Sequence, residues 1–430
     1  MSKQKNYLIG GAAAAKEYIN LEELIPEIKG ITEIKQSHTG RIKDKLVGKL
    51  KIPDNITHIG DNAFNYCTQI TTVELPVGLT HIGVAAFLGC SNLTKIVFSE
   101  SLKDIGEQAF SECKMLAEIV LPDNLKHIGK LAFEECINLT KIVFPKRLKN
   151  IGNQAFVNCK MLTKIVFPES LESMGPYAFY KCEMLSEIVF LKGLKNIGRS
   201  AFQECKMLTK IVFPESLESI NLYAFAGCSN LTNIVFPEGL KYISFHAFAY
   251  CKMLDNIVFP EGLKEIDSQA FKDCSNLTKV VFPSKKISMD INVFENCGKL
   301  TQITFAGDRF KSFKDATDMA FHAGIPKDTT RTAQWNVDIH DASNEKTTKT
   351  VRGIWEPGNT VADKPNHKLI MGISTSTVEI KIKQFEEEKH KSGRLEAGEE
   401  PIENNIPVEA RGLSKHKKKK GKKKSKKKKK

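Results

Sequence analysis

Hydrophobic positions along the chain recur in one register, and that register repeats every 23 residues. Cysteine marks it most clearly, because all eleven cysteines fall in one series with this spacing, from Cys67 to Cys297. A phenylalanine stands three residues before each of them, from Phe64 to Phe294. Self-similarity at a fixed period of this length predicts stacked structural units rather than an ordinary compact domain.

Each unit contains three local patterns. In a central unit, the β-branched pair Ile165–Val166 stands shortly before Pro168, which predicts a short strand that ends in a turn. A second extended piece follows in each unit, as at Leu148–Gly152, and Ala155–Cys159 then predicts a single helical or 3₁₀ turn. One such unit cannot bury its apolar residues alone, so the copies must stack on each other.

A glycine ends the second extended piece in seven units, where it fits a backbone with positive φ or a close approach of two chains. Later units carry Asn, Ser or Asp there, and Asn and Asp tolerate left-handed geometry better than most residues. The turn is therefore expected to persist along the array. The glycines are Gly60, Gly83, Gly106, Gly129, Gly152, Gly175 and Gly198, and their replacements are Asn221, Ser244, Asp267 and Asp290.

The letters Leu-x-x-Ile-x-Phe-Pro, Ile-Gly and Ala-Phe-x-x-Cys, repeated eleven times from about Leu50 to Phe305, resemble the BspA-like leucine-rich repeats of bacterial and protist surface proteins. The resemblance implies an α/β repeat fold, a leucine-rich-repeat solenoid with a parallel sheet along one side and short helical or 3₁₀ turns. It also implies export, and roles that include adhesion and host-matrix binding. The strands should pair at about 4.8 Å.

The flanking segments differ from the repeats in composition. Ile19–Ile25 predicts a helix that shields the first unit, since terminal repeats need a polar cap. The domains we expect are 1–49 (N-terminal segment with capping helix), 50–305 (eleven repeats), 306–342 (degenerate closing unit), 343–413 (polar, largely flexible linker) and 414–430 (poly-lysine tail).

The net charge of +14 is a property of the tail. Thirteen lysines lie between Lys415 and Lys430, and without them the chain is close to neutral. Such a segment cannot fold, and we expect a disordered arm that attracts nucleic acid or anionic lipid, or acts in nuclear import. A solubilising tail without a partner is the alternative. The candidate residues for an anionic partner are Lys417, Lys418, Lys419, Lys420, Lys426, Lys427, Lys428, Lys429 and Lys430.

Strand alternation identifies a candidate binding face. If Ile165 and Phe167 point into the core, Lys164 and Val166 point outward. Nine consecutive units then place valine on the solvent side, beside a polar row with five lysines, as in a groove for a protein or glycan partner. The candidates are Val97, Val120, Val143, Val166, Val189, Val212, Val235, Val258 and Val281, with Lys95, Lys141, Lys164, Lys210 and Lys279. The alternative is that valine is a good strand former, copied with the repeat.

Other residue patterns favour structural roles. The cysteine column could form disulfides, but side chains in a parallel ladder point the same way, so buried and reduced packing thiols are favoured. His58, His81 and His127 share one repeat position with Asp104 and could form a line of metal ligands. Asn150 continues this series in the next unit, which favours an exposed polar column instead. We expect no cofactor, no bound metal and no enzyme activity.

The sequence thus predicts a monomeric, non-catalytic scaffold that binds a protein or glycan on its sheet face, in adhesion or host interaction. The second hypothesis is a nucleic-acid-associated or nuclear-targeted protein that acts through the lysine tail. No apolar run approaches the 18 residues of a membrane span. Buried-type cysteines and a weak N-terminal export pattern favour a cytoplasmic location, with nuclear or exported locations as the alternatives.

Overall fold

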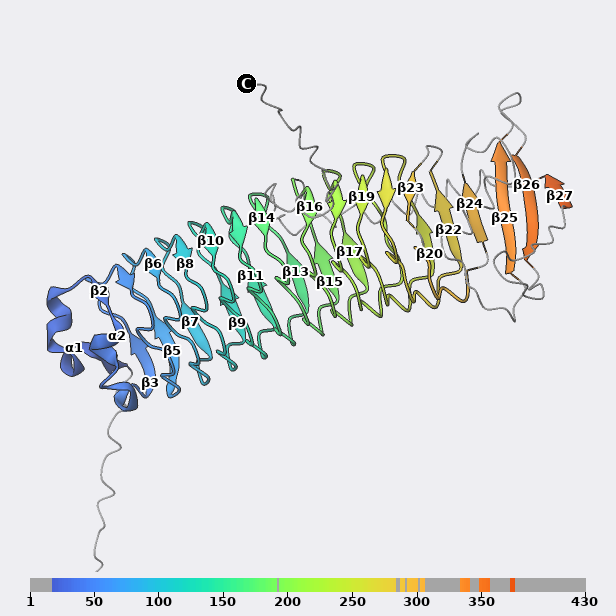
Figure 1. Cartoon of the computed structure of the whole chain (residues 1–430). Coiled ribbons are helices and arrows are strands. Elements are labelled where there is room, and N and C mark those ends of the chain that lie inside the picture. The colour runs from blue at the N-terminus through green and yellow to red at the C-terminus, as the bar shows by residue number, and fades with distance from the viewer. Residues whose placement is uncertain are drawn as a thin grey trace, which may run out of the picture.

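The computed structural model of the chain describes residues 18–191, 193–283, 287–290, 292–300 and 302–305, and three strands at 333–340, 348–355 and 372–375. The repeats form an elongated stack of similar turns, each of which we call a rung (Figure 1). Successive strands pair in parallel at a distance of one repeat, as Ile165 does with Ile188. The predicted leucine-rich-repeat solenoid is therefore confirmed.

The N-terminal segment closes the first rung with short elements. The Asn20 side chain accepts a hydrogen bond from the Glu22 amide and caps the first helix, while Leu21 and Ile28 lie in the core. The elements are β1 (Ile19–Asn20), α1 (Leu21–Leu24), η1 (Pro26–Gly30), β2 (Glu33–Ile34), α2 (Gln36–Thr39) and η2 (Lys43–Lys45). β1 and β2 pair with the first strands of the two repeat sheets, so this segment covers the end of the core.

One row of strands, which we call the first sheet, runs along the front of the molecule in Figure 1. In most of these strands the middle residue is buried and the two outer residues point to solvent, because side chains alternate across a strand. The strands are β3 (Gly48–Lys51), β5 (Ile70–Glu74), β7 (Lys95–Val97), β9 (Glu118–Val120), β11 (Lys141–Val143), β13 (Lys164–Val166), β15 (Glu187–Val189), β17 (Lys210–Val212), β20 (Asn256–Val258), β22 (Lys279–Phe282) and β24 (Gln302–Phe305).

The second extended piece of each unit forms a second parallel sheet, so the solenoid has two sheets where the sequence predicts one. Each strand has two residues, the second of which is an isoleucine or methionine directed into the core in all but the last rung. The strands are β4 (His58–Ile59), β6 (His81–Ile82), β8 (Asp104–Ile105), β10 (His127–Ile128), β12 (Asn150–Ile151), β14 (Ser173–Met174), β16 (Asn196–Ile197), β18 (Ser219–Ile220), β19 (Tyr242–Ile243), β21 (Glu265–Ile266) and β23 (Ser288–Met289).

The third side of each rung consists of tight turns between the second sheet and the cysteine. The Phe156 amide donates to the Ala178 carbonyl of the next rung at 2.8 Å, while the Ala155 amide bonds three residues back within its own rung. Hydrogen bonds between residues three apart, as in the predicted 3₁₀ turn, are therefore present within a rung. Every second amide, however, donates to the next rung. Gln154 and Asn158 adopt a φ of 58°, and this pair of left-handed residues recurs along the array.

The recurring glycines allow close approach and do not supply positive φ. A Cβ atom on Gly129 would lie 2.4 Å from the backbone carbon of Gly106 on the preceding rung. The left-handed residues stand two and six positions further along the chain. Of the two explanations that the sequence left open, close approach is thus the correct one, and Asn221 occupies the position without left-handed geometry.

Phenylalanine fills the core in two columns. The rings that precede the cysteines stack on each other from rung to rung, as Phe156 does on Phe133 and Phe179 with centroids 5.2 and 5.0 Å apart. Phe144 belongs to a second column and meets Phe156 edge-on at 5.8 Å. Stacked and edge-to-face rings add to the free energy gained from burial of their area.

All eleven cysteines are buried free thiols, which confirms the predicted packing role. Each from Cys90 onward donates to the carbonyl oxygen of a phenylalanine 26 residues earlier, at 3.1 to 3.4 Å. Burial raises the pKa of ten thiols. The pKa of Cys67 rises to about 11, and the pKa values of the other nine thiols, which lie inside the array, rise by more. These thiols are therefore neutral structural groups.

Beyond the last repeat, three strands form an antiparallel sheet, β25 (Ala333–His340), β26 (Thr348–Trp355) and β27 (Gly372–Thr375). The last two fall within 343–413, the span for which the sequence predicts a polar, largely flexible linker. The tail at 414–430 lies outside the described residues.

Candidate partner-binding face

The first sheet presents the nine valines predicted from strand alternation, which we call the valine row. Its N-terminal part is open, because Val97, Val120 and Val143 are 45%, 66% and 37% exposed on three successive rungs. Val120 and Val143 pair in register on adjacent strands. Three successive strands, β7, β9 and β11, thus each expose an aliphatic side chain on this face.

The rest of the row is less accessible than the alternation predicts. Val166, Val212, Val258 and Val281 are half-buried, whereas Val235 is 36% exposed and thus as open as Val143. Val189 is only 2% exposed, so its assignment to the solvent side is wrong. It pairs with Val166 and Val212, and these neighbours pack against it along the ladder. The turn after it also differs, since Leu191 stands where the other rungs carry proline, apart from Ser99.

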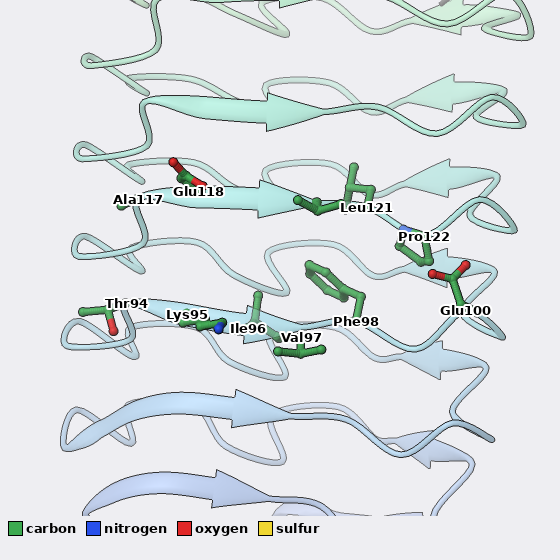
Figure 2. Close-up of a pocket in the computed structure, with 11 residues that line it drawn as sticks. Thr94, Lys95, Ile96, Val97, Phe98, Glu100, Ala117, Glu118, Leu121 and Pro122 are labelled. Atoms are coloured by element: carbon green, nitrogen blue, oxygen red, sulfur yellow. The ribbon is translucent and has the colours of Figure 1, made fainter.

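A hollow of about 570 Å³ opens between β7 and β9, beside the exposed valines (Figure 2). Among the described strands, the ladder of the first sheet is interrupted here, as it also is between β11 and β13 and between β17 and β20. Phe98 is half-buried here and faces Leu121 of the next rung, which has a smaller side chain than the phenylalanines of later rungs. The hollow is lined by Thr94, Lys95, Ile96, Val97, Phe98, Glu100, Ala117, Glu118, Val120, Leu121 and Pro122.

The row beside the valines alternates in charge and is paired at its centre. Lys95 and Lys141 are exposed on either side of Glu118. Further along, the Glu187 carboxylate lies 3.3 Å from Lys164 and 2.7 Å from Lys210. Burial alone would raise the pKa of Glu187, but the hydrogen bonds and charges of these two lysines outweigh it and lower the pKa. The expected basic row is thus neutralised in its middle.

Lys279 closes this polar row at the C-terminal end of the array and is half-buried.

Next to the row runs a column of hydroxyl side chains that sequence reasoning missed. Thr94 donates to the carbonyl of Thr71 at 2.9 Å, and Ser186 donates to that of Thr163 at 3.0 Å. The recurrence of Thr or Ser before most of the outward lysines and glutamates was the available indication, with Ala117 before Glu118 as an exception. These hydroxyls satisfy backbone carbonyls at the edge of the sheet.

The histidine column lies on the second sheet. His58 and His81 stack with their centroids 4.8 Å apart, and His81 Nε2 lies 3.4 Å from an Asp104 oxygen. His127 Nδ1 is 2.7 Å from the Asn150 amide nitrogen. Among the described residues, no group of three His, Cys, Asp or Glu side chains is arranged to hold a metal ion. The column is a continuous line of polar contacts on the surface.

The lysines from Lys417 to Lys430 that the sequence singles out lie outside the described residues. Of the residues that are described, none belongs to a helix long and apolar enough to cross a membrane.

Comparison with known families gives one match over most of the array. The model of the BspA type leucine-rich repeat region matches six copies, over residues 43–162, 115–217, 149–255 and 195–323. These segments join into a stretch that covers more than half of the chain. The chain belongs to the BspA-type leucine-rich repeat family. This agrees with the resemblance in the repeat letters, and it makes the protein a repeat scaffold.

A solved structure of a bacterial leucine-rich repeat protein shares the fold, and a second one is similar in sequence. A leucine-rich repeat protein from Bacteroides ovatus is 25% identical with a TM-score of 0.50, over 72% of this chain and 88% of that one. A leucine-rich cell surface protein from Faecalibacterium prausnitzii is 27% identical with a TM-score of 0.41, over 65% and 83% of the two chains. Among curated protein sequences, no match was found.

Proposed function

We propose that this member of the family is a non-catalytic scaffold that binds a protein partner on the first sheet, over Val97, Val120 and Val143. The observation that carries the proposal is the exposure of these three valines on successive rungs beside an open hollow. Soluble proteins rarely expose contiguous apolar surface unless it serves a contact. A partner with a matching apolar side chain would bury the row and fill the hollow.

A protein suits this face better than a glycan. The valine side chains offer no hydrogen bond and no aromatic ring to a sugar, whereas an aliphatic surface with a polar rim is typical of the core of a protein interface. Lys95, Glu118 and Lys141 supply that rim with alternating charges, which favours specificity over general attraction. Adhesion to a host or matrix protein is the role that we propose for this contact.

The experiment uses the full chain and its binding partner, isolated by affinity capture and then purified. The triple variant Val97→Glu, Val120→Glu and Val143→Glu should weaken binding at least 100-fold in surface plasmon resonance, because it places three carboxylates in an apolar contact. The matched control is Val84→Glu, whose valine is 42% exposed in the turn after β6, away from this face. Equal binding by the triple variant and the control would exclude the valine row as the site.

A second proposal rests on the thirteen lysines between Lys415 and Lys430. Their charge density suits a nucleic acid, so we propose that the tail adds non-specific attachment to phosphates. The affinity of the full chain for a duplex DNA should then fall steeply with salt, and deletion of 415–430 should abolish binding. Microscopy of the full-length and tail-deleted proteins would show whether the tail also sets the location. Unchanged DNA binding after the deletion would contradict this proposal.

A further inference from the structure

Aromatic side chains gather on the third side of the solenoid, away from both sheets. Tyr177 and Tyr180 meet edge-on with centroids 5.7 Å apart. Two rungs further, Tyr223 contacts Phe245 at 5.8 Å and His246 at 4.9 Å. All five are half-buried, so each ring keeps part of its surface open. We call these five residues the aromatic site.

The fold does not require aromatic residues here. Tyr177, Tyr223 and His246 occupy the first left-handed position of their rungs, with φ values of 58°, 56° and 55°. Gln108 and Gln154 hold the same position with φ values of 55° and 58°, so polar side chains give the same backbone. Non-glycine residues hold this geometry from Asn62 to Asn292, so it belongs to the repeat and does not depend on the aromatic side chains. Unlike the valines, these residues are not copies of the common repeat.

Two buried polar atoms without hydrogen-bond partners lie in the same column. Ser200 stands on the rung between Tyr177 and Tyr223, is 1% exposed, and its hydroxyl has no partner. His246 Nδ1 is also buried and unpartnered. Buried polar atoms of this kind are rare in folded proteins and call for an explanation.

A chain of hydrogen bonds determines which nitrogen of the His246 imidazole carries the proton. The Gln269 amide nitrogen donates to Glu295, so its oxygen faces His246 Nε2 at 2.9 Å and accepts from it. Nδ1 is then an acceptor on a neutral ring. Burial acts in the same direction, because it lowers the pKa of His246. The column therefore offers a hydroxyl and an acceptor nitrogen to an incoming polar ligand.

Aromatic faces combined with a few inward hydrogen-bonding groups are the usual lining of a small-ligand site. A pyranose ring matches both features, since its C–H face packs on an aromatic ring while its hydroxyls donate and accept hydrogen bonds. The 4.9 Å between the Tyr223 and His246 rings is comparable with the length that one sugar adds to a linear chain. Successive sugars can therefore follow successive rungs.

The cations of this surface are already engaged with rings. Arg199 lies 5.7 Å from the centroid of Tyr177, and the Lys181 ammonium lies 5.1 Å from that of Tyr180. These contacts favour a neutral ligand over an anionic one. We propose that the aromatic site binds a linear oligosaccharide of neutral pyranose units, which contacts the Tyr177 and Tyr223 rings and donates a hydroxyl to His246 Nδ1.

The test is isothermal titration calorimetry of the full chain with four probes: cellohexaose, maltohexaose, mannohexaose and chitohexaose. We expect at least one to bind, and Tyr177→Gln and Tyr223→Gln each to weaken it at least tenfold. Glutamine is chosen because other rungs carry it at this position, so the variants retain the fold. Tyr66→Gln is the matched control, a 54% exposed tyrosine that is also left-handed but lies outside the site.

The valine variants described above should bind the sugar normally, since the aromatic site lies on another side of the solenoid. Binding that Tyr177→Gln and Tyr223→Gln leave unchanged would overturn the proposal. It would also be overturned if none of the four oligosaccharides binds at millimolar concentration.

Discussion

The Cys159 thiol donates a 3.2 Å hydrogen bond to the carbonyl oxygen of Phe133, a residue 26 positions earlier on the preceding rung. The same contact recurs between neighbouring rungs along the array, as between Cys182 and Phe156. Each thiol thus joins two rungs while it fills the space beside the stacked rings. The cysteine column is a polar link within an apolar core.

This column predicts a steep loss of stability in alkaline solution. Burial raises the pKa of the thiols in the folded chain, so above pH 9 the unfolded chain loses protons that the folded chain retains. Stability is complete below the unfolded pKa and falls as the pH rises above it, by up to about 1.4 kcal/mol per pH unit for each thiol. Guanidinium unfolding followed by circular dichroism between pH 7 and 10.5 measures this slope.

The control for the alkaline prediction is Cys159→Ser, whose hydroxyl can still donate to Phe133 but does not titrate in this range. Lysines and tyrosines titrate alike in both proteins, so the difference between the two slopes isolates the thiol. If the two slopes coincide, the Cys159 thiol does not ionise on unfolding as described.

The column of stacked phenylalanine rings that precede the cysteines, which we call the ring column, predicts a large loss of stability when one ring is removed. Phe156→Ala removes a buried ring that stacks on Phe133 and Phe179, and it should lower the free energy of unfolding by about 3 to 5 kcal/mol. Phe98→Leu is the comparison, because Phe98 is half-buried and Leu75 and Leu121 hold its position on the adjacent rungs. It should cost less than about 1.5 kcal/mol in the same denaturation experiment. Similar losses for both variants would argue against the ring column as the main core.

The close approach of successive rungs makes Gly129 intolerant of a methyl group. Its Cβ would lie 2.4 Å from the backbone of Gly106, so Gly129→Ala should cost about 1 to 3 kcal/mol and lower the melting temperature. Gly78→Ala is the matched substitution, since a Cβ there meets nothing within 4 Å. It should stay within about 0.5 kcal/mol of the parent protein. A tolerated Gly129→Ala would show that the rungs can separate locally.

Much of the fold follows from the repeat period. A phenylalanine stands three residues before the cysteine in every unit, as Phe133 does before Cys136, which indicates that both side chains point into the core. The units must then stack on each other, because one unit cannot bury its own apolar residues. The second sheet was harder to predict. Its strands, such as Asn150–Ile151, have only two residues, which is too short for an alternating pattern to appear in the sequence. Pairing with the neighbouring rung creates these strands.

The binding face was predicted only in part, because exposure depends on neighbours in space. Alternation correctly directs Val120 outward, but it gives Val189 the same orientation although adjacent rungs cover it. It also could not show that Glu187 pairs with lysines on both sides. Tyr177 and Tyr223 were visible as departures from the repeat. Their relation to the buried hydroxyl of Ser200 required the three-dimensional stack.

Hydrogen–deuterium exchange of the full chain with and without its purified protein partner locates the contact surface on the solenoid. We expect slower exchange in the complex over β7, β9 and β11 and their connecting turns, with the third side and the second sheet unchanged. This pattern would place the partner over Val97, Val120 and Val143. Protection confined to the second sheet or to the third side, with the three strands exchanging as in the free protein, would contradict it.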